Sequence, residues 1–253
     1  MIIRTVLQVS FLAGFLAVAP VAANAELANI LKATLAESGQ KTGEVSTEEM
    51  RQILKDGSAT LLDTRTRAEF DAGHIPGAIV LDVPPETQVT EVSRLVRGEK
   101  AAALVLYCNG PFCQASRRLA DKLADAGFSN VRRYQLGIPV WRALGGPTAV
   151  ELSGFQRVFG HDDTAVFIDV RSADEFERGS LVGAKSVPVE DVISGKLKKI
   201  DLPEDDFNRR IVLFGRDAHQ ARQLAEVLSK RPWHNVAYYA GTYPTLAPAL
   251  PSK

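Results

Sequence analysis

The sequence predicts an α/β protein built from two repeated units, each a parallel β-sheet with helices on both faces. Short apolar runs alternate with amphipathic segments along the chain, which is the pattern of such sheets. In addition, the stretch LLDTRTRAEFDAGHIPGAIVLDVP (residues 61–84) reappears as FIDVRSADEFERGSLVGAKSVPVE (residues 167–190). The repeat indicates two homologous units, with a boundary near the Gly-Gly-Pro of residues 145–147.

The elements of the first unit follow from their residue patterns. ATLLD (residues 59–63) is a short apolar run that ends in an aspartate, as expected for a buried parallel strand. RAEFDAG (residues 67–73) is typical of a short helix that ends at a glycine. Further strands are expected at residues 78–83, 102–107 and 130–135, and further helices at residues 86–98 and 115–127.

The amino-terminal residues have the pattern of a secretory signal. A positive charge at Arg4 precedes an apolar run at residues 9–18 and the small-residue exit Ala23-Asn24-Ala25. The run is short for the ~30 Å core of a bilayer, so cleavage after Ala25 is favoured over a membrane anchor. The expected organisation is a signal peptide (1–25), a helical segment or linker (26–44), a first domain (45–147) and a second domain (148–253). The expected location is periplasmic or secreted, without membrane attachment after cleavage.

Composition narrows the classes of partner and of fold. The chain has 30 Lys and Arg against 30 Asp and Glu, and it contains no basic run. We therefore expect no nucleic-acid partner. Two cysteines are too few for a disulfide-stapled scaffold, so the fold has to rest on an apolar core.

Both cysteines lie in LVLYCNGPFCQASRRLADKL (residues 104–123), where a predicted strand meets a predicted helix. A loop that opens onto a helix amino terminus offers unpaired backbone amides and the positive end of the helix dipole. A thiolate at Cys108 would be stabilised there, with a pKa below the free value of ~8.5. The alternative is a buried structural thiol, which poorly explains two cysteines that bracket a turn.

These residues, with YQLGIPVW (residues 134–141) further on, resemble the rhodanese family of sulfurtransferases over nearly all of the mature chain. The resemblance implies a tandem rhodanese-like pair in which Cys108 is the nucleophile. The catalytic rhodanese-like domain is then residues 45–147, and the non-catalytic one is residues 148–253. The resemblance also implies a substrate-binding cradle formed by the five residues that follow: Asn109, Gly110, Pro111, Phe112 and Cys113. Cys113 departs from the family pattern, because many members have a non-thiol residue there. In the second unit Gly215 stands in place of Cys108, and the loop after it is expected to be about two residues shorter.

The implied reaction moves a sulfane sulfur from thiosulfate or a similar donor, through a persulfide on Cys108, to cyanide, a small thiol or a protein thiol. No metal or organic cofactor is expected, because two thiols supply half a ligand set and His74 is predicted to be structural. A thiol–disulfide redox protein that uses Cys108 and Cys113 is the alternative, and a non-enzymatic partner-binding module is another. A phosphatase is disfavoured, since Gln114 occupies the position where related phosphatases have an arginine.

Three expectations concern details of the site. Residues five apart can bring their Cα atoms within the ~4.4–6.8 Å that a disulfide allows, so Cys113 either guards Cys108 as a reversible partner or only fills the inner wall of the loop. The residues between the cysteines carry no charge, which weakens the case for thiosulfate as donor. The Asp-x-Arg elements that recur in both units, Asp63 with Arg65 and Asp169 with Arg171, are predicted to be ion pairs that hold the fold.

Overall fold

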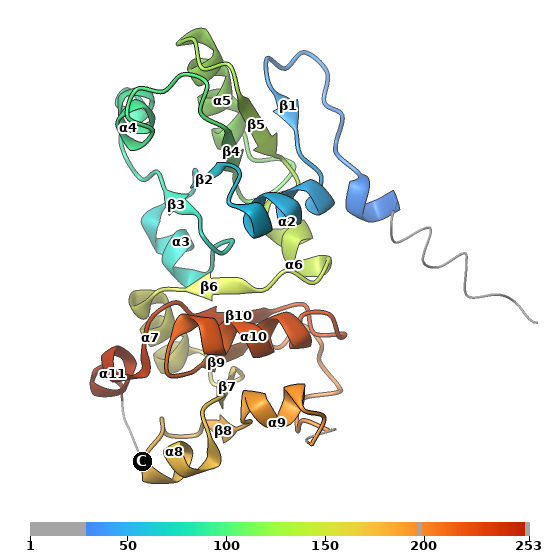
Figure 1. Cartoon of the computed structure of the whole chain (residues 1–253), viewed down its shortest axis with the longest axis vertical. Coiled ribbons are helices and arrows are strands. Elements are labelled where there is room, and N and C mark those ends of the chain that lie inside the picture. The colour runs from blue at the N-terminus through green and yellow to red at the C-terminus, as the bar shows by residue number, and fades with distance from the viewer. Residues whose placement is uncertain (1–28, 197–198, 251–253) are drawn as a thin grey trace, which may run out of the picture.

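The computed structural model describes residues 29–196 and 199–250 and shows two α/β units stacked along the long axis of the molecule (Figure 1). The predicted signal peptide, residues 1–25, lies outside the described residues. Within the described part of the chain, no helix combines the length and the apolar character that crossing a bilayer requires. Residues 29–32 are helical, and an irregular segment leads from them to the first strand.

The first unit is a parallel sheet of five strands in the order β1-β5-β4-β2-β3. Its strands are β1 (Gly43–Glu44), β2 (Thr60–Asp63), β3 (Ile79–Val80), β4 (Leu104–Tyr107) and β5 (Val131–Tyr134). Its helices are α2 (Thr47–Asp56), α3 (Arg67–Ala72), α4 (Gln88–Leu95), α5 (Ala115–Asp125) and α6 (Gly137–Ala143). No strand of this unit is longer than four residues. The strands β2, β3, β4 and β5 are each shorter than the sequence run that predicted them.

The second unit repeats this order as β6-β10-β9-β7-β8, again with parallel neighbours. Its strands are β6 (Thr148–Val150), β7 (Val166–Asp169), β8 (Lys185–Ser186), β9 (Ile211–Phe214) and β10 (Val236–Tyr239). Its helices are α7 (Leu152–His161), α8 (Ala173–Arg178), α9 (Val189–Ile193), α10 (Ala218–Leu228) and α11 (Tyr243–Leu246), followed by the 3₁₀ turn η1 (Ala247–Ala249). The identical strand order confirms the two-unit α/β prediction.

Successive side chains along the central strands β2 and β4 point to opposite faces of the first sheet, and each face has an apolar core. Leu61 and Val105 point into a cluster with Met50 of α2 and Trp141 of α6. Their neighbours in the sequence point into the opposite cluster, with residues of α4 and α5. Helices therefore cover both faces of the sheet, as predicted.

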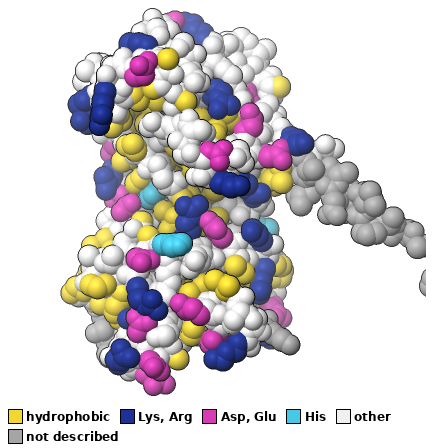
Figure 2. All heavy atoms as spheres, in the orientation of Figure 1, with side chains coloured by type: hydrophobic (Ala, Val, Ile, Leu, Met, Phe, Trp, Pro, Cys, Tyr) yellow, Lys and Arg dark blue, Asp and Glu magenta, His cyan; other side chains and the backbone are white. Residues whose placement is uncertain are grey.

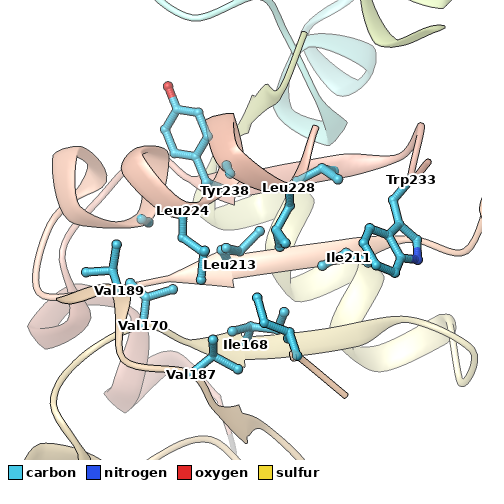
Figure 3. Close-up of a cluster of buried hydrophobic side chains, with 14 of the residues drawn as sticks. Ile168, Val170, Val187, Val189, Ile211, Leu213, Leu224, Leu228, Trp233 and Tyr238 are labelled. Carbon is cyan, nitrogen blue, oxygen red and sulfur yellow. The ribbon is translucent and has the colours of Figure 1, made fainter. Parts of the chain in front are cut away.

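The second unit has the same two-sided core. One cluster lies between the sheet and α9 and α10, where Ile168, Leu213 and Leu224 pack together with Trp233 (Figure 3). The opposite cluster contains the aromatic rings of Phe155 of α7 and its neighbours. Each unit thus has its own apolar core on each side of its sheet.

The two units meet through backbone contacts. His74 and Ala149 form an antiparallel bridge in which each amide donates to the other carbonyl at 2.9 Å. The Glu151 amide donates to the Asp71 carbonyl at 3.0 Å. Gly154 of α7 lies so close to α3 that a Cβ there would be 1.9 Å from the Asp71 carbonyl oxygen. The packing of α7 on α3 therefore requires a glycine at position 154.

Exposed charges of both signs are interspersed over both units on the face drawn in Figure 2. Neither sign gathers into a broad patch on that face. This arrangement agrees with the equal numbers of acidic and basic residues in the sequence.

Candidate active site

The cysteine loop connects β4 to α5 and covers residues 108–114. Cys108 follows the last residue of β4 and is 4% exposed. Gly110 adopts a φ of 121°, which a residue with a side chain rarely does, and the Cys113 amide donates to the Gly110 carbonyl at 3.0 Å. The structure contains a Cys108–Cys113 disulfide with a Cα–Cα distance of 6.1 Å. The sequence analysis did not decide whether this disulfide forms. The Cα–Cα distance falls within the usual range for disulfides.

Several backbone N–H groups of the cysteine loop itself are free to donate hydrogen bonds. In the part of the chain that the structure describes, the amides of Asn109, Gly110, Phe112 and Gln114 have no protein acceptor. Gln114 occupies the N-cap of α5 without a capping hydrogen bond from its side chain. Free amides at the amino terminus of an eleven-residue helix favour negative charge. The loop can therefore stabilise a thiolate or a persulfide anion at Cys108.

Two residues that the sequence analysis did not select support the loop from β5 and α6. The Gln135 side-chain amide donates to the carbonyls of Pro111 and Cys113, both at 3.2 Å. Gly137 has a φ of 65°, and a Cβ there would lie 2.5 Å from the Cys108 carbonyl oxygen and 2.5 Å from the Gly110 nitrogen. The only signal for either was their place in YQLGIPVW, after the strand next to β4.

The predicted cradle residues have different environments. The Asn109 side-chain amide donates to Glu69 Oε1 at 2.5 Å. Burial raises the pKa of Glu69, but hydrogen bonds from Asn109 and Thr66 outweigh it, so the pKa lies below its ordinary value. Phe112 is 96% exposed and Cys113 is half-buried. Gly110 is buried and Pro111 is half-buried, whereas Asn109 and the Phe112 ring are exposed to solvent.

A cavity of about 270 Å³ opens beside Asn109, between the two units. Asn109, Pro139 and Arg142 line it from the first unit, and Arg210 lines it from the second. The Ile138 amide, on the same wall, donates to the Cys108 carbonyl at 3.3 Å. The second unit thus contributes a wall to the cavity next to the cysteine loop.

The repeated Asp-x-Arg elements are buried ion pairs, as predicted. Arg65 Nη2 donates to Asp63 Oδ2 at 2.6 Å and to the Gly73 carbonyl at 2.8 Å. Arg171 makes the same two contacts with Asp169 and Gly179, at the same distances. In each unit the arginine joins the glycine after a short helix, α3 or α8, to the aspartate that ends a central strand, β2 or β7. These bonds agree with the predicted role of the pair in holding the fold.

His74 is buried and stacks on Phe70 at a ring-centroid distance of 3.7 Å. Its Nδ1 lies 3.0 Å from the Phe70 carbonyl oxygen, and its backbone forms the bridge to the second unit. Burial lowers its pKa to about 4, so the ring is neutral at physiological pH. These contacts agree with the predicted structural role.

The corresponding loop of the second unit lacks both the thiol and the space for one. Three residues, 215–217, separate β9 from α10, against seven residues, 108–114, between β4 and α5. The loop is therefore four residues shorter, and the expected difference of about two was wrong. Asp217 caps α10 directly by accepting from the Gln220 amide at 2.8 Å, so the helix begins earlier and no cradle forms.

The family model described as Rhodanese-like domain matches residues 46–144 and 156–246. The chain belongs to the rhodanese family. Both matched segments correspond to the α/β units seen in the structure, and the first of them contains the cysteine loop.

The chain is similar to proteins that are named for different functions. It is 36% identical over 110 residues to the human thiosulfate:glutathione sulfurtransferase, a match that covers 38% of this chain and 90% of that protein. It is 30% identical over 131 residues to the HTH-type transcriptional regulator Rv0324 of Mycobacterium tuberculosis, covering 52% of this chain and 55% of the regulator. This rhodanese chain thus spans about half of the regulator's length.

Among solved structures, a rhodanese-like domain from Anabaena is 33% identical and matches with a TM-score of 0.32, over 36% of this chain and 92% of that one. The curated relatives that share the domain are named as a sulfurtransferase and as a transcriptional regulator. The domain supports chemistry related to sulfur transfer, and the reaction of this chain has to be argued from its own residues.

Proposed function

We propose that the first unit is a sulfurtransferase that moves a sulfane sulfur from an anionic donor such as thiosulfate to a nucleophilic acceptor. The observation that carries the proposal is the place of Cys108, at the end of β4 and beside unpaired amides at the start of α5. Similarity to a sulfurtransferase over 90% of that relative's length supports the assignment. The acceptor is cyanide, a small thiol or a protein thiol.

The cycle has two displacement steps. The Cys108 thiolate attacks the outer sulfur of thiosulfate, the S–S bond of the donor breaks, and sulfite leaves with the bonding electron pair. Cys108 then carries a persulfide anion, whose negative charge the loop amides and the helix dipole stabilise. The acceptor attacks the terminal sulfur and restores the Cys108 thiolate. Neither step changes the number of protons bound to the cysteine.

The disulfide form cannot begin this cycle, because Cys108 has no free thiolate while it is bonded to Cys113. A dithiol reductant has to supply two electrons and two protons first, which gives two cysteine thiols and an oxidised reductant. The active protein in this proposal is the reduced one. The disulfide form is a resting state that protects Cys108 from further oxidation.

Steady-state sulfur transfer tests the proposal. Reduced protein is incubated with thiosulfate and cyanide, and thiocyanate is measured over time. The Cys108→Ser variant is expected to lose turnover while its circular dichroism spectrum is unchanged, because a serine hydroxyl is not ionised near neutral pH. Turnover by Cys108→Ser at the parent rate would overturn the assignment of the nucleophile.

The disulfide also favours a second candidate, a thiol–disulfide redox protein that uses the Cys108–Cys113 pair. The two functions differ in what Cys113→Ser does. Sulfur transfer needs one thiol and survives this substitution, whereas exchange of a disulfide with a partner needs both thiols. Loss of thiocyanate formation in Cys113→Ser, together with catalysed reduction of a protein disulfide by the parent, would favour the redox function.

We propose further that the protein acts after export, with residues 1–25 removed. Support comes from the sequence pattern that ends in Ala23-Asn24-Ala25 and from an oxidisable cysteine pair, which suits an oxidising compartment. Amino-terminal sequencing of protein recovered from a periplasmic or secreted fraction is expected to start at Glu26. Recovery of the chain in the cytoplasm with Met1 retained would contradict export.

A further inference from the structure

A buried glutamine of the strand beside β4 fixes part of the cysteine loop. Gln135 follows the last residue of β5, the neighbour of β4 in the sheet, and it is 2% exposed. Its Nε2 donates to the carbonyl oxygens of Pro111 and Cys113, each at 3.2 Å. One side chain therefore sets the orientation of two peptide groups between Cys108 and α5.

Those two peptide groups contain two of the free amides of the loop. The Pro111 carbonyl shares its peptide group with the Phe112 amide. The Cys113 carbonyl shares its peptide group with the Gln114 amide. In a trans peptide the C=O and N–H bonds point in opposite directions, and no peptide bond of the described residues is cis. The Phe112 and Gln114 amides therefore point away from Gln135, and neither has an acceptor in the described part of the chain.

The other partners of Gln135 decide which end of its side-chain amide faces the loop. Its Oε1 accepts from Arg133 Nη1 at 2.7 Å and from Ser116 Oγ at 3.4 Å. A guanidinium only donates and a carbonyl oxygen only accepts, so the NH₂ group of Gln135 has to face the loop. An ionised glutamate at this position could accept from Arg133 but could not donate to the loop.

Arg133 is fully buried, and carboxylates from the amino-terminal part of the first unit hold it in place. Glu37 Oε2 accepts from both Nη1 and Nη2 of Arg133 at 3.2 Å, and Glu44 Oε1 of β1 lies 3.9 Å from Nη2. A guanidinium with such partners has little freedom to turn. A chain of hydrogen bonds thus runs from Glu37 through Arg133 and Gln135 to the cysteine loop.

The second unit, which lacks the thiol, also lacks this chain of bonds. β10 takes the place of β5 in the strand order, and both strands have four residues. The third residue of the strand is Arg133 in β5 and Tyr238 in β10. The residue after the strand is Gln135 in the first unit and Ala240 in the second. The Asp-x-Arg ion pairs recur in both units, whereas arginine and glutamine at these two positions occur only in the unit that has the cysteine loop.

We propose that Gln135 is a positioning residue for sulfur transfer, which turns the amides of Phe112 and Gln114 toward the sulfur anion on Cys108. The inference rests on the proposed chemistry at Cys108. It applies to the thiolate that attacks the donor and to the persulfide anion that forms, because both place negative charge on sulfur. The cradle is then not a property of the loop sequence alone, since a residue outside the loop sets the direction of two of its donors.

The pH dependence of Cys108 alkylation measures this effect without any sulfur donor. The full chain with Cys113→Ser is used, because Cys108 is then its single thiol. Iodoacetamide reacts with the thiolate, so the midpoint of the alkylation rate against pH reports the ionisation of Cys108. Gln135→Met removes the donor at similar side-chain length. We expect the midpoint to rise by at least about one pH unit, the tenfold effect typical of losing a hydrogen bond to a charged group.

A second variant keeps the test decisive where Gln135→Met fails to fold. Glu37→Gln combined with Gln135→Glu exchanges two partners of Arg133, so the net charge stays the same and both acceptors remain. The donor to the loop is lost, and the midpoint should again rise. Ser116→Ala is the matched control, since Ser116 contacts only Oε1 of Gln135 and its loss leaves Nε2 with the loop. Its midpoint should equal that of the Cys113→Ser parent.

An unchanged midpoint in the Gln135→Met and exchange variants would overturn the positioning role, including the case in which both variants unfold more easily than the parent. Loss of packing alone lowers the free energy of unfolding without moving the ionisation of Cys108. A midpoint that rises in Ser116→Ala as far as in Gln135→Met would also overturn it, because the change would then follow from any disturbance of the site.

Persulfide formation by reduced protein with both cysteines separates this inference from the proposed function. If no donor leaves a persulfide on Cys108, the sulfurtransferase function fails, and the alkylation midpoints still decide the role of Gln135. If a persulfide forms at the same rate in Gln135→Met and the parent, the function stands and the positioning role fails. The proposal predicts that Gln135→Met forms the persulfide at least about tenfold more slowly, and that Ser116→Ala forms it at the parent rate.

Discussion

Gly137→Ala provides a quantitative test of how the cysteine loop is held. Gly137 has a φ of 65°, and its missing Cβ would lie 2.5 Å from the Cys108 carbonyl oxygen and 2.7 Å from the Gly110 Cα. An alanine there is strained for two reasons. The left-handed backbone costs about 1–2 kcal/mol for a residue with a side chain, and the overlap with the loop costs about 1–3 kcal/mol more.

Gly127→Ala separates these two costs. Gly127 also has a positive φ, 86°, but its Cβ would meet no atom within 4 Å. This variant should therefore lose only the backbone cost of about 1–2 kcal/mol. The difference between the two variants isolates the contact with the cysteine loop.

Urea denaturation under identical redox conditions measures both free energies of unfolding, and mass spectrometry measures the rate of persulfide formation on reduced protein. Gly137→Ala should be less stable than Gly127→Ala and should form the persulfide more slowly, because the loop has to shift away from β5 and α6. Gly127→Ala should form it at the parent rate. Equal stability of the two variants, with unchanged persulfide formation in Gly137→Ala, would refute this account of the loop.

Three further predictions concern the second unit, the interface and the disulfide. Gly215→Cys, made together with Cys108→Ser, should form no persulfide, because a Cβ at 215 would lie 2.8 Å from Gln220 Oε1 in a loop without a cradle. The His74 pKa of about 4 lies below the ordinary value of 6.5, so the neutral ring stabilises the fold above pH 6.5. That contribution, about 3 kcal/mol at most, should be lost between pH 6.5 and pH 4, and His74→Gln should remove this part of the pH dependence. Cys113→Ser should transfer sulfur normally after reduction but should be inactivated by peroxide faster than the parent.

Each of these has an outcome that contradicts it. A sulfur adduct at position 215 would show that the second unit lacks only its thiol. If the free energy of unfolding of His74→Gln fell between pH 6.5 and pH 4 as steeply as that of the parent, His74 would not be the source of the loss. Equal peroxide inactivation of Cys113→Ser and the parent would leave Cys113 with no guarding role.

The sequence was sufficient to predict the architecture because both units carry the same pattern in the same order. The aspartate that ends β2 and the one that ends β7 each pair with an arginine two residues later, so one observation could be checked against the other. The position of Cys108 was predictable for a similar reason. A buried apolar run followed by a turn and an amphipathic helix defines the carboxyl end of a parallel strand.

The arginine-lined cavity could not be predicted from the sequence. Arg142 lies on α6 and Arg210 precedes β9, and the two share a cavity only because the units stack in one particular way. That stacking depends on close backbone contacts such as Gly154 with Asp71, which leave no periodic signal. The length of the second loop was misjudged because Asp217 caps α10 directly, whereas Gln114 gives α5 no such cap.

The most direct test of the central claim is the mass of the reduced protein after incubation with thiosulfate. We predict that intact mass spectrometry shows a gain of one sulfur atom, and that peptide mapping locates it on Cys108. The gain should disappear on addition of cyanide or a thiol and should be absent from Cys108→Ser. A reduced protein whose mass does not change with thiosulfate or with any other sulfane donor, or a sulfur adduct mapped to Cys113 alone, would contradict sulfur transfer through Cys108.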